Sequence, residues 1–511
     1  MDPNKPFYIT TAIDYANGSP HLGHAVEKIG ADVVARYHRR KGEKVHFVIG
    51  MDEHGQKVLQ SAESAGVSPA EWVDSIAKEF VDAWEVLSIS YDDFIRTTED
   101  RHHLGVQEII RRIEAKGDFY QGTYAGYYCV GCEGYKTEDE LMKEEGQDLR
   151  CPTHPSLGIQ WMEEENWFFR LSAYTEPLLE LLEKRPEFVQ PEIRRNEIRN
   201  VLKGGLEDIS VSRSRLPWGV PWPEDPEHIV YVWLDALTNY LTAVGFPDEK
   251  YRDTWPADVH VIGKDITRFH CIYWPAFLLS AGLELPKTVW AHGFVTYGGQ
   301  KLSKSSGVTF ELQEAIERHG PDSLRYYLLR EVPWNGDGDI TRERFDERYT
   351  SELANDLGNL ANRSLTMIEK YRGGVGPAAP SRSLDEHCRK AVDRYEEVMD
   401  DGLLHLGIHT TMDLVSQANG FIERQAPWSL AKDPAGGPEL DATLASLARA
   451  LLVAATLLHP FMPERMGELS RRLGASEVPT LDLALTLNLS GNSVIRGEPL
   501  FPRPDLKTKG V

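Results

Sequence analysis

Apolar residues near the start of the chain change their spacing along the sequence, and these changes predict a strand, a helix and a second strand. The mostly apolar run 7–13 is short and lies between Pro6 and Asp14, which is typical of a buried strand. Four apolar residues then recur at spacings of three, four and four, as on one helix face: Val26, Ile29, Val33 and Tyr37. Gly42 ends this pattern, and 45–49 is a second buried-strand run.

Strands joined through helices form parallel sheets, whose ligands bind at the C-terminal ends of the strands. The alternation therefore predicts an α/β fold with a Rossmann-like parallel sheet. The strand pattern returns at 229–233, 259–262 and 289–292. We expect four polar residues to lie at the C-terminal edge of the sheet: Tyr15, His21, His24 and Asp52.

The rest of the chain divides by composition. From 118 to 217 aromatic residues, metal-ligand types and glycine-rich turns dominate, which indicates an insertion between two halves of the sheet. Beyond 341 strand patterns fade and long helical patterns follow, with a linker-like break at 373–380. We predict a sheet domain in two halves (1–117 and 218–340), the insertion (118–217), an α-helical domain (341–490) and a tail (491–511).

Bulk composition narrows the class of protein. The formal net charge of −23 argues against a broad nucleic-acid-binding surface, although a local basic face remains compatible with it. No uninterrupted apolar stretch reaches the ~20 residues that span a bilayer, and the N-terminus lacks the form of a signal peptide. Five cysteines are too few for a disulfide scaffold, so we expect a cytoplasmic protein without membrane contact.

The segment after the first strand has features of a phosphate site. A helix N-terminus offers unpaired backbone N–H groups, Gly18 permits a turn and Pro20 suits the first helical turn. Gly23 leaves room for a base or ribose, and His21 and His24 face the same side as phosphate donors. The alternative is a helix cap with two surface histidines.

A second cationic motif lies far along the chain, behind Gly298 and Gly299. Its lysines and hydroxyl form a plausible clamp on departing pyrophosphate: Lys301, Ser303 and Lys304. Transfer of an α-phosphoryl group to a carboxylate needs positioning and charge neutralisation more than acid–base chemistry. Alone, this motif is compatible with a solvated lysine loop. The two motifs together, in a β/α setting, indicate an enzyme that activates a carboxylate with ATP.

Four metal-ligand residues have the spacing of a zinc knuckle within the predicted insertion. Three thiolates and one imidazole suit tetrahedral zinc: Cys129, Cys132, Cys151 and His154. Four protein ligands leave no open position, so we favour a structural zinc over a catalytic one. A disulfide is disfavoured by the expected compartment, and free thiols by the spacing.

The motifs resemble those of the class I aminoacyl-tRNA synthetases and, more narrowly, the methionyl-tRNA synthetase family, over nearly the whole chain. The two signatures are 21–24 and 301–305; Leu302 stands where methionine is commoner, a packing-neutral exchange. Narrower matches are 12–18, 231–236 and 263–266, although Leu237 replaces a proline of some members. The resemblance implies a catalytic domain, an inserted zinc-bearing connective domain and an all-α anticodon-binding bundle.

The resemblance also assigns ligands. It implies that Asp52 holds the α-ammonium and that eight residues surround the methionine thioether: Ile13, Tyr15, Trp233, Ala236, Tyr240, Ile266, His270 and Trp274. Aromatic surfaces suit a polarizable thioether, although the residues alone are equally typical of a core. Further ATP contacts are implied for Lys264, Asp265, His292 and Gly293, and anticodon contacts for Asn359, Arg363 and Trp428. The alternative for the last three is a surface pair and an inter-helix tryptophan.

We therefore expect ATP-dependent activation of methionine, with Mg²⁺, and transfer to initiator and elongator methionine tRNAs. His21, His24, Lys301 and Lys304 carry the catalysis in this hypothesis. The alternatives are a cysteinyl-type synthetase, whose zinc would lie in the amino-acid pocket, and a non-catalytic RNA-binding relative, which would have damaged signatures. Since the chain ends soon after the helical segment, we also expect a monomer.

Overall fold

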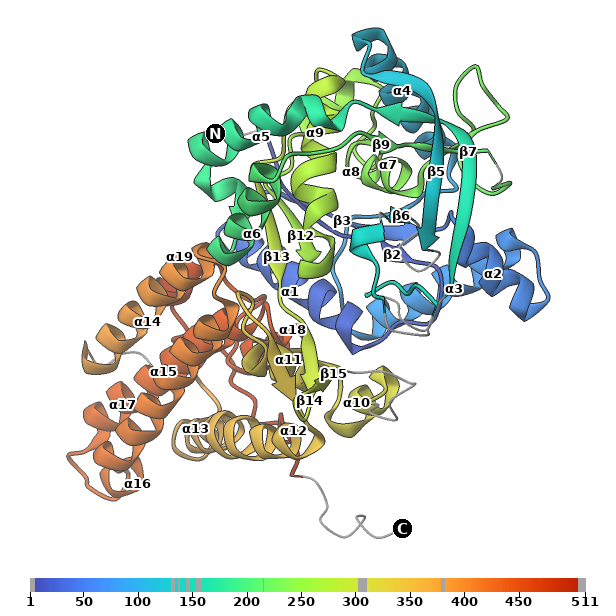
Figure 1. Cartoon of the computed structure of the whole chain (residues 1–511). Coiled ribbons are helices and arrows are strands. Elements are labelled where there is room, and N and C mark those ends of the chain that lie inside the picture. Colours follow the sequence, from blue (N-terminus) through green and yellow to red (C-terminus); the bar gives the residue numbers. More distant parts are fainter. Residues whose placement is uncertain are drawn as a thin grey trace. The chain divides into compact units, whose positions relative to one another are not determined.

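The structure is a computed structural model and describes residues 5–129, 134–136, 138–143, 148–152, 158–214, 216–301, 310–377 and 382–503 (Figure 1). The chain forms two compact units, each assembled from separate segments. Unit 1 consists of Met1–Pro20, His46–Trp84 and Tyr91–His292. Unit 2 consists of His21–Val45, Glu85–Ser90 and Gly293–Val511.

A seven-stranded sheet forms the centre of unit 1, in the order β2-β3-β1-β12-β13-β8, with β4 also paired to β3. Its strands are β1 (Phe7–Thr11), β2 (Asp14–Tyr15), β3 (Val45–Asp52), β4 (Asp93–Arg96), β8 (Val189–Gln190), β12 (Val259–Gly263) and β13 (Thr288–His292). The pairs β2–β3, β3–β4, β1–β12, β12–β13 and β13–β8 are parallel. The predicted parallel α/β sheet is confirmed. Each of the predicted runs 7–13, 45–49, 259–262 and 289–292 overlaps one of its strands.

The register of the parallel strands brings distant residues to one edge. Tyr15 lies opposite Asp52 where β2 meets β3, and Gly263 lies opposite His292 where β12 meets β13. Strand ends from separate parts of the sequence therefore present their side chains and the loops that follow at the same edge of the sheet.

The prediction of a strand over 229–233 is mostly wrong. Only β11 (Ile229–Val230) is a strand, and it pairs antiparallel with β10 (Ser212–Arg213), outside the parallel sheet. Tyr231 instead caps the short helix α7 (Val232–Leu237), most of which is buried. A continuous apolar run does not by itself distinguish a buried strand from a buried helix.

A second sheet of unit 1 is antiparallel, in the order β6-β5-β7-β9. Its strands are β5 (Phe119–Cys129), β6 (Gly134–Lys136), β7 (Ile159–Phe169) and β9 (Ile209–Ser210). These strands lie in the segment predicted as an insertion, as does β8, which pairs with the parallel sheet. The domain boundaries at 117 and 217 stay a prediction.

Helices make up much of the rest of unit 1. They are α2 (Gln56–Ala65), α3 (Pro69–Val86), α4 (Asp100–Lys116), α5 (Thr175–Lys184), α6 (Glu192–Lys203), α7, α8 (Asn239–Thr242) and α9 (Trp274–Ser280). The short helical turns η5 (Lys264–Ile266) and η6 (Phe269–Tyr273) lie between β12 and α9.

Unit 2 contains helix α1 (Leu22–Arg40), which two buried contacts attach to the rest of the unit. Arg325 of helix α11 (Pro321–Glu331) donates to Asp32 Oδ2 of α1 over 2.7 Å. At Gly30 an added Cβ would lie 2.2 Å from the Trp334 ring, so only glycine allows this close approach. The predicted helix through 26–37 is confirmed, ending at Arg40 shortly before Gly42.

The remainder of unit 2 is a small sheet followed by helices. The sheet has the order β15-β14-β16, with β14 (Val295–Tyr297), β15 (Gln300–Lys301) and β16 (Gly338–Ile340). The helices are α10 (Leu312–His319), α11 (Pro321–Glu331), α12 (Arg342–Arg348), the π-helix η8 (Tyr349–Gly358), α13 (Asn359–Arg372), α14 (Arg382–Asp400), α15 (Leu404–Gln425), α16 (Pro427–Leu430), α17 (Gly437–Leu458), α18 (Pro463–Arg472) and α19 (Leu481–Thr486). Helices α14, α15 and α17 pack on one another (Figure 1). The predicted C-terminal helical region is confirmed.

One helix of the described chain, α17, is long and apolar enough to cross a membrane by length and composition alone. Of its most apolar window, 78% is buried, which is typical of the central helix of a helical core. The end of the described chain packs on the same unit, since Ile495 N donates to Arg472 O and the Tyr349 hydroxyl donates to Pro502 O.

Candidate active site

The end of β3 carries a buried acidic loop in unit 1. Asp52, Glu53 and His54 are 9%, 0% and 3% exposed. The loop is fixed on both sides, because Asp52 O accepts from Ala16 N over 2.9 Å and Glu53 N donates to Thr97 Oγ1 over 2.9 Å. An acidic side chain on a backbone held in this way at a strand end is suited to binding a cation.

Aromatic residues form a connected cluster in unit 1. The Tyr240 hydroxyl lies 2.7 Å from His270 Nε2, and the Trp233 and Phe269 rings stack with centroids 3.6 Å apart. Trp233 and His270 also meet edge to face, at 6.3 Å between centroids. The cluster therefore joins α7, α8 and η6, and it unites three of the predicted pocket residues with Phe269, which sequence reasoning had given no role.

His260 contacts two residues of the predicted pocket, Tyr240 and Trp274, in the buried interior of unit 1. His260 of β12 stacks on Tyr240 with ring centroids 4.1 Å apart, and Trp274 Nε1 donates to His260 Nε2 over 3.4 Å. Because that nitrogen accepts, Nδ1 carries the ring proton and donates to Thr10 Oγ1 at 2.7 Å. Burial holds the pKa of His260 well below its ordinary value, so this histidine is a neutral support for Tyr240 and Trp274.

The other predicted pocket residues lie on the same unit. Ile13 connects β1 with β2, and with Tyr15 and Ile266 it packs against the hydrophobic core. Ala236 is buried on α7. The structure thus places all eight predicted thioether-pocket residues and Asp52 in unit 1.

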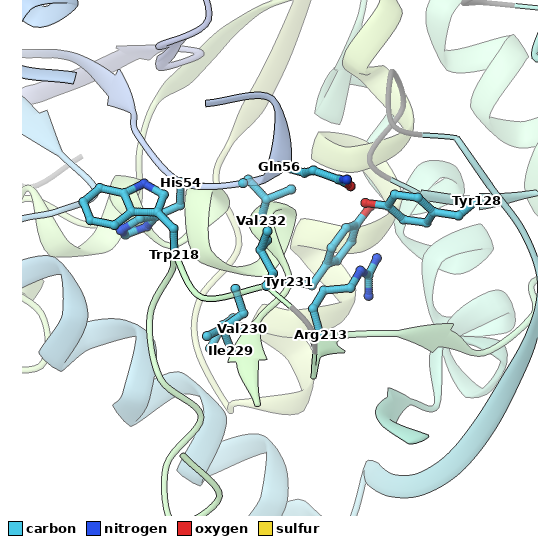
Figure 2. A pocket seen from close by; sticks show the side chains of 11 residues that line it. His54, Gln56, Tyr128, Arg213, Trp218, Ile229, Val230, Tyr231 and Val232 are labelled. Atoms are coloured by element: carbon cyan, nitrogen blue, oxygen red, sulfur yellow. The ribbon is translucent and has the colours of Figure 1, made fainter. Parts of the chain in front are cut away.

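A small cavity beside the acidic loop was not predicted. Figure 2 shows the Gln56 amide, the Tyr231 ring and the Tyr128 hydroxyl pointing toward one another within it. Arg213 lies 4.5 Å from the Tyr231 ring centroid and 5.7 Å from that of Tyr128. The lining comes from separate segments, which no local motif connects: His54, Gly55, Gln56, Tyr128, Arg213, Leu216, Trp218 and 229–232.

The predicted ATP residues of unit 1 lie at the ends of neighbouring strands. Lys264 and Asp265 follow β12 directly, and buried His292 ends β13. An added Cβ at Gly263 would meet Asp265 Oδ1 at 2.7 Å, so the carboxylate folds over the backbone of that glycine. This arrangement offers a cation, an anion and an imidazole at one sheet edge.

In unit 2, His21 and His24 stack at the start of α1, with ring centroids 3.7 Å apart. His21 Nδ1 accepts from Gly23 N at 3.1 Å, and His24 Nδ1 accepts from His21 N at 3.3 Å. Nε2 is then the protonated nitrogen of each neutral ring, as a phosphate donor requires. Burial, with His21 and Lys28 nearby, lowers the pKa of His24 well below its usual value. His21 caps the helix, as the alternative interpretation predicts, and its role as a phosphate donor stays a prediction.

Two predicted ATP-site glycines of unit 2 lie where a side chain would meet neighbouring atoms. A Cβ at Gly23 would lie 2.9 Å from His21 Cε1, because the imidazole folds over that residue. A Cβ at Gly293 would lie 2.1 Å from Gly336 O, so this glycine is required by packing. Lys301 belongs to β15, opposite Thr296. Ser303, Lys304 and Leu302 lie outside the described residues.

Two of the four predicted metal ligands, Cys132 and His154, lie outside the described residues. The other two, Cys129 and Cys151, are fully buried. Cys129 pairs with Ile159, while Arg150 bridges to Gly158, so adjacent backbone partners connect the two cysteines. Among the residues that the structure describes, no three ligand side chains form a metal cluster.

The helical part of unit 2 joins two of the predicted anticodon residues. Arg363 of α13 lies 2.6 Å from Glu423 of α15, and its guanidinium lies 5.7 Å from the Trp428 ring centroid. Trp428 is 37% exposed, and Asn359 is exposed at the start of α13. A cation and an aromatic face at the surface of a helical bundle are suited to stacking with an unpaired base.

Comparisons with known proteins agree along nearly the full chain. Residues 7–365 match the family model described as tRNA synthetases class I (M). The methionine–tRNA ligase of Thermotoga maritima is 43% identical over 98% of this chain and 81% of its own length, and that of Streptomyces coelicolor is 44% identical over 98% and 97%. The crystal structure of Mycobacterium tuberculosis methionyl-tRNA synthetase bound by methionyl-adenylate superposes with a TM-score of 0.93 at 41% identity, covering 98% of this chain and all of that one.

Proposed function

The chain belongs to the methionyl-tRNA synthetase family of class I tRNA synthetases, and from this membership we propose how its residues divide the work of charging a methionine tRNA. It is a methionine–tRNA ligase that activates methionine with ATP and transfers it to tRNA. A methionine carboxylate oxygen attacks the α-phosphorus of ATP, and the bond to the bridging oxygen of pyrophosphate breaks. A hydroxyl of the terminal tRNA ribose then attacks the adenylate carbonyl, and AMP leaves.

We assign methionine to the aromatic cluster of unit 1. Tyr240, His270 and Trp233 form a surface of ring edges and faces, which suits a polarizable thioether. Asp52 supplies the carboxylate for the α-ammonium, opposite Tyr15 in the sheet register. Ile13, Ala236, Ile266 and Trp274 complete the predicted pocket.

The predicted ATP contacts are assigned within each unit by itself. In unit 2, His21 and His24 donate from Nε2 to phosphate oxygens at a helix N-terminus, and Gly23 accommodates the nucleotide. Lys301 and Lys304 would neutralise charge on the departing pyrophosphate, together with Mg²⁺, and the Ser303 hydroxyl would donate a hydrogen bond to it. In unit 1 the predicted ATP contacts are Lys264, Asp265 and His292. In unit 2 Gly293 is a further predicted contact.

Structural zinc is supported by the donor set and by the burial of the two described cysteines. Cys129 and Cys151 are connected through the backbone pairs Cys129–Ile159 and Arg150–Gly158, as a knuckle requires. Cys132 and His154 would complete the tetrahedron. When bound, zinc supplies structural cross-linking at this end of the sheet, and no catalytic step involves it.

Recognition of tRNA is assigned to α13 and its neighbours. The Arg363 guanidinium, near both Glu423 and the Trp428 ring, would exchange the carboxylate for a base edge while Trp428 stacks on a base. Asn359 adds an exposed amide one helical turn away. We further propose a cytoplasmic monomer that charges both initiator and elongator methionine tRNAs.

The observation that carries the proposal is the aromatic cluster built around the Tyr240–His270 contact, in a chain that matches methionyl enzymes over its full length. The test is the charging of methionine tRNA with labelled methionine and ATP. Acid-precipitable label that depends on ATP, on tRNA and on an intact CAU anticodon is the expected result. A folded protein that binds the tRNA without charging it would instead be a non-catalytic RNA-binding relative.

A further inference from the structure

A buried carboxylate on α7 bridges two histidines of unit 1 that the proposed function does not use. Asp235 Oδ2 lies 2.7 Å from His54 Nδ1, and Asp235 Oδ1 lies 2.7 Å from His102 Nε2. His102 Nδ1 is in turn 2.9 Å from Thr242 Oγ1. The resulting chain of hydrogen bonds connects the loop after β3 with α7, α4 and α8.

Two members of this chain of hydrogen bonds are close in sequence to residues assigned to opposite ends of the amino-acid substrate. His54 is two residues from Asp52, which is assigned to the ammonium, and Asp235 is adjacent to Ala236 of the thioether pocket. On a helix, Trp233 and Ala236 share one face, whereas Asp235 points well away from it. Asp235 therefore acts through other residues and has no direct contact with methionine in this arrangement.

Burial and charge make this network stiff. The side chains of Asp235, His54 and His102 are 0%, 4% and 0% exposed. Burial by itself raises the pKa of the Asp235 carboxyl, but the charges and hydrogen bonds of His54 and His102 outweigh it and hold that pKa well below its ordinary value. Both carboxylate oxygens thus stay acceptors, and both histidine partners keep fixed orientations.

We propose that Asp235, His54 and His102 are positioning residues that hold the Asp52 loop at a fixed separation from helix α7, and so set the distance between the ammonium site and the thioether pocket. This inference rests on the proposed assignment of Asp52 to the ammonium. Its specific consequence is that breaking the network reduces the contribution of the ammonium group to binding more than it reduces binding of the thioether.

Two ligands separate these contributions. Methioninol has the ammonium and the thioether, whereas 4-(methylthio)butan-1-ol lacks the ammonium; both are measured as inhibitors of methionine-dependent pyrophosphate exchange. The ratio of their inhibition constants reports the ammonium contact, about 10- to 100-fold for a charge-assisted hydrogen bond. Asp235→Asn should reduce this ratio by about tenfold, because a small misplacement of a binding group is costly.

Variants at His54 separate positioning from simple packing. His54→Asn keeps a side-chain N–H donor near the position of Nδ1, whereas His54→Leu keeps more of the apolar volume and has no donor. The inference predicts that the ratio survives in His54→Asn and falls in His54→Leu. The reverse order would show that His54 only fills space, and would overturn the proposal even if Asp235→Asn failed to fold.

The matched control is Asp225→Asn in the same unit, which removes a carboxylate that lies 3.0 Å from His228 Nδ1 as an ion pair and accepts a hydrogen bond from Trp167 Nε1. It should keep the ratio of the unsubstituted protein. Asp52→Asn should bring the ratio of the two inhibition constants to about one, because the ammonium contact is lost. If the ratio is unchanged, the assignment of the ammonium to Asp52 fails. If this ratio falls to about one in Asp52→Asn but is unchanged in Asp235→Asn and His54→Leu, the positioning role of the network is contradicted. The proposed function then stands.

Discussion

Tyr240 and His270 fix each other's hydrogen-bonding roles. His270 Nδ1 lies 3.1 Å from the Ile266 carbonyl oxygen, which can only accept, so Nδ1 carries the proton. In the neutral ring, Nε2 therefore accepts from the Tyr240 hydroxyl at 2.7 Å. The proton of Tyr240 is directed at His270, and both side chains are held in orientations that suit recognition of one substrate shape.

Removal of the Tyr240 hydroxyl tests this arrangement. Tyr240→Phe loses one buried hydrogen bond and leaves His270 without its donor, at a cost of about 1 to 2 kcal/mol. We expect KM for methionine to rise about tenfold, with KM for ATP changed less than about twofold. Pyrophosphate-exchange kinetics measure both constants, and an unchanged KM for methionine would show that the Tyr240–His270 contact does not shape the pocket.

The double role of His21 can be separated by two substitutions. Serine is a good helix cap but cannot reach a phosphate, whereas alanine does neither. Both His21→Ser and His21→Ala should lower kcat/KM for exchange about 100-fold. Only His21→Ala should also lower the free energy of unfolding, by about 1 kcal/mol. Urea unfolding checks the second effect, and equal stability of the two variants would argue against the capping hydrogen bonds.

Arg363 should matter for tRNA and not for amino-acid activation. Arg363→Gln removes the cation that lies near Trp428, so kcat/KM for charging should fall about 10- to 100-fold while pyrophosphate exchange stays unchanged. Arg424→Gln, which removes an exposed charge from the same helix as Glu423, is the control and should cost about twofold or less. Equal losses in both variants would indicate a general electrostatic effect instead of anticodon recognition.

Acid should weaken unit 2 through Asp32. Burial raises the pKa of this carboxyl, but Arg36, Arg325 and hydrogen bonds from Ser90 outweigh it and lower the pKa to about 2. A lowered folded-state pKa contributes stability above the unfolded value, and that stability disappears as pH falls through the folded value. We expect a loss of about 2 kcal/mol between pH ~5 and pH ~2 from this group, measured by urea unfolding.

The matched variant for this effect is Asp32→Asn. It should be destabilised by about 3 to 5 kcal/mol near neutral pH, because Arg325 would keep its buried charge without a carboxylate. Its stability should also fall less steeply with acid. Asp82→Asn breaks an exposed ion pair with Lys78 and should stay within about 0.5 kcal/mol of the unsubstituted protein. The same acid dependence in Asp32→Asn would exclude this carboxyl as its source.

Zinc content tests the predicted knuckle. The purified protein should hold about one zinc per chain, and Cys151→Ser should lose most of it because one of four ligands is gone. Cys388→Ser removes a different buried cysteine, from α14, and should retain the metal. Elemental analysis gives the result directly. Zinc-free unsubstituted protein, purified without chelators, would contradict the site.

The parts of the fold that sequence predicts are those with local periodicity. Strands at 7–11 and 45–52 and helix α1 follow from runs and spacings that are complete within one segment. The segment 229–233 failed because its residues are apolar throughout, and burial on every side removes the period that separates a strand from a helix.

The candidate site divides in the same way. Sequence motifs predict residues whose contacts are close in the sequence, such as His21 and His24. The partners of Asp235 could not be predicted, because His54 and His102 lie on other segments and only tertiary folding brings them within hydrogen-bonding distance. A buried aspartate in an apolar helix is nevertheless a signal, since it requires donors from elsewhere.

The central claim is that this chain activates methionine with ATP, and the most direct measurement is exchange of labelled pyrophosphate into ATP with each of the twenty amino acids, without tRNA. We predict exchange with methionine alone, reduced in Tyr240→Phe and lowered about 100-fold in His21→Ala. Exchange with cysteine in place of methionine, or none with any amino acid from folded and zinc-loaded protein, would contradict it.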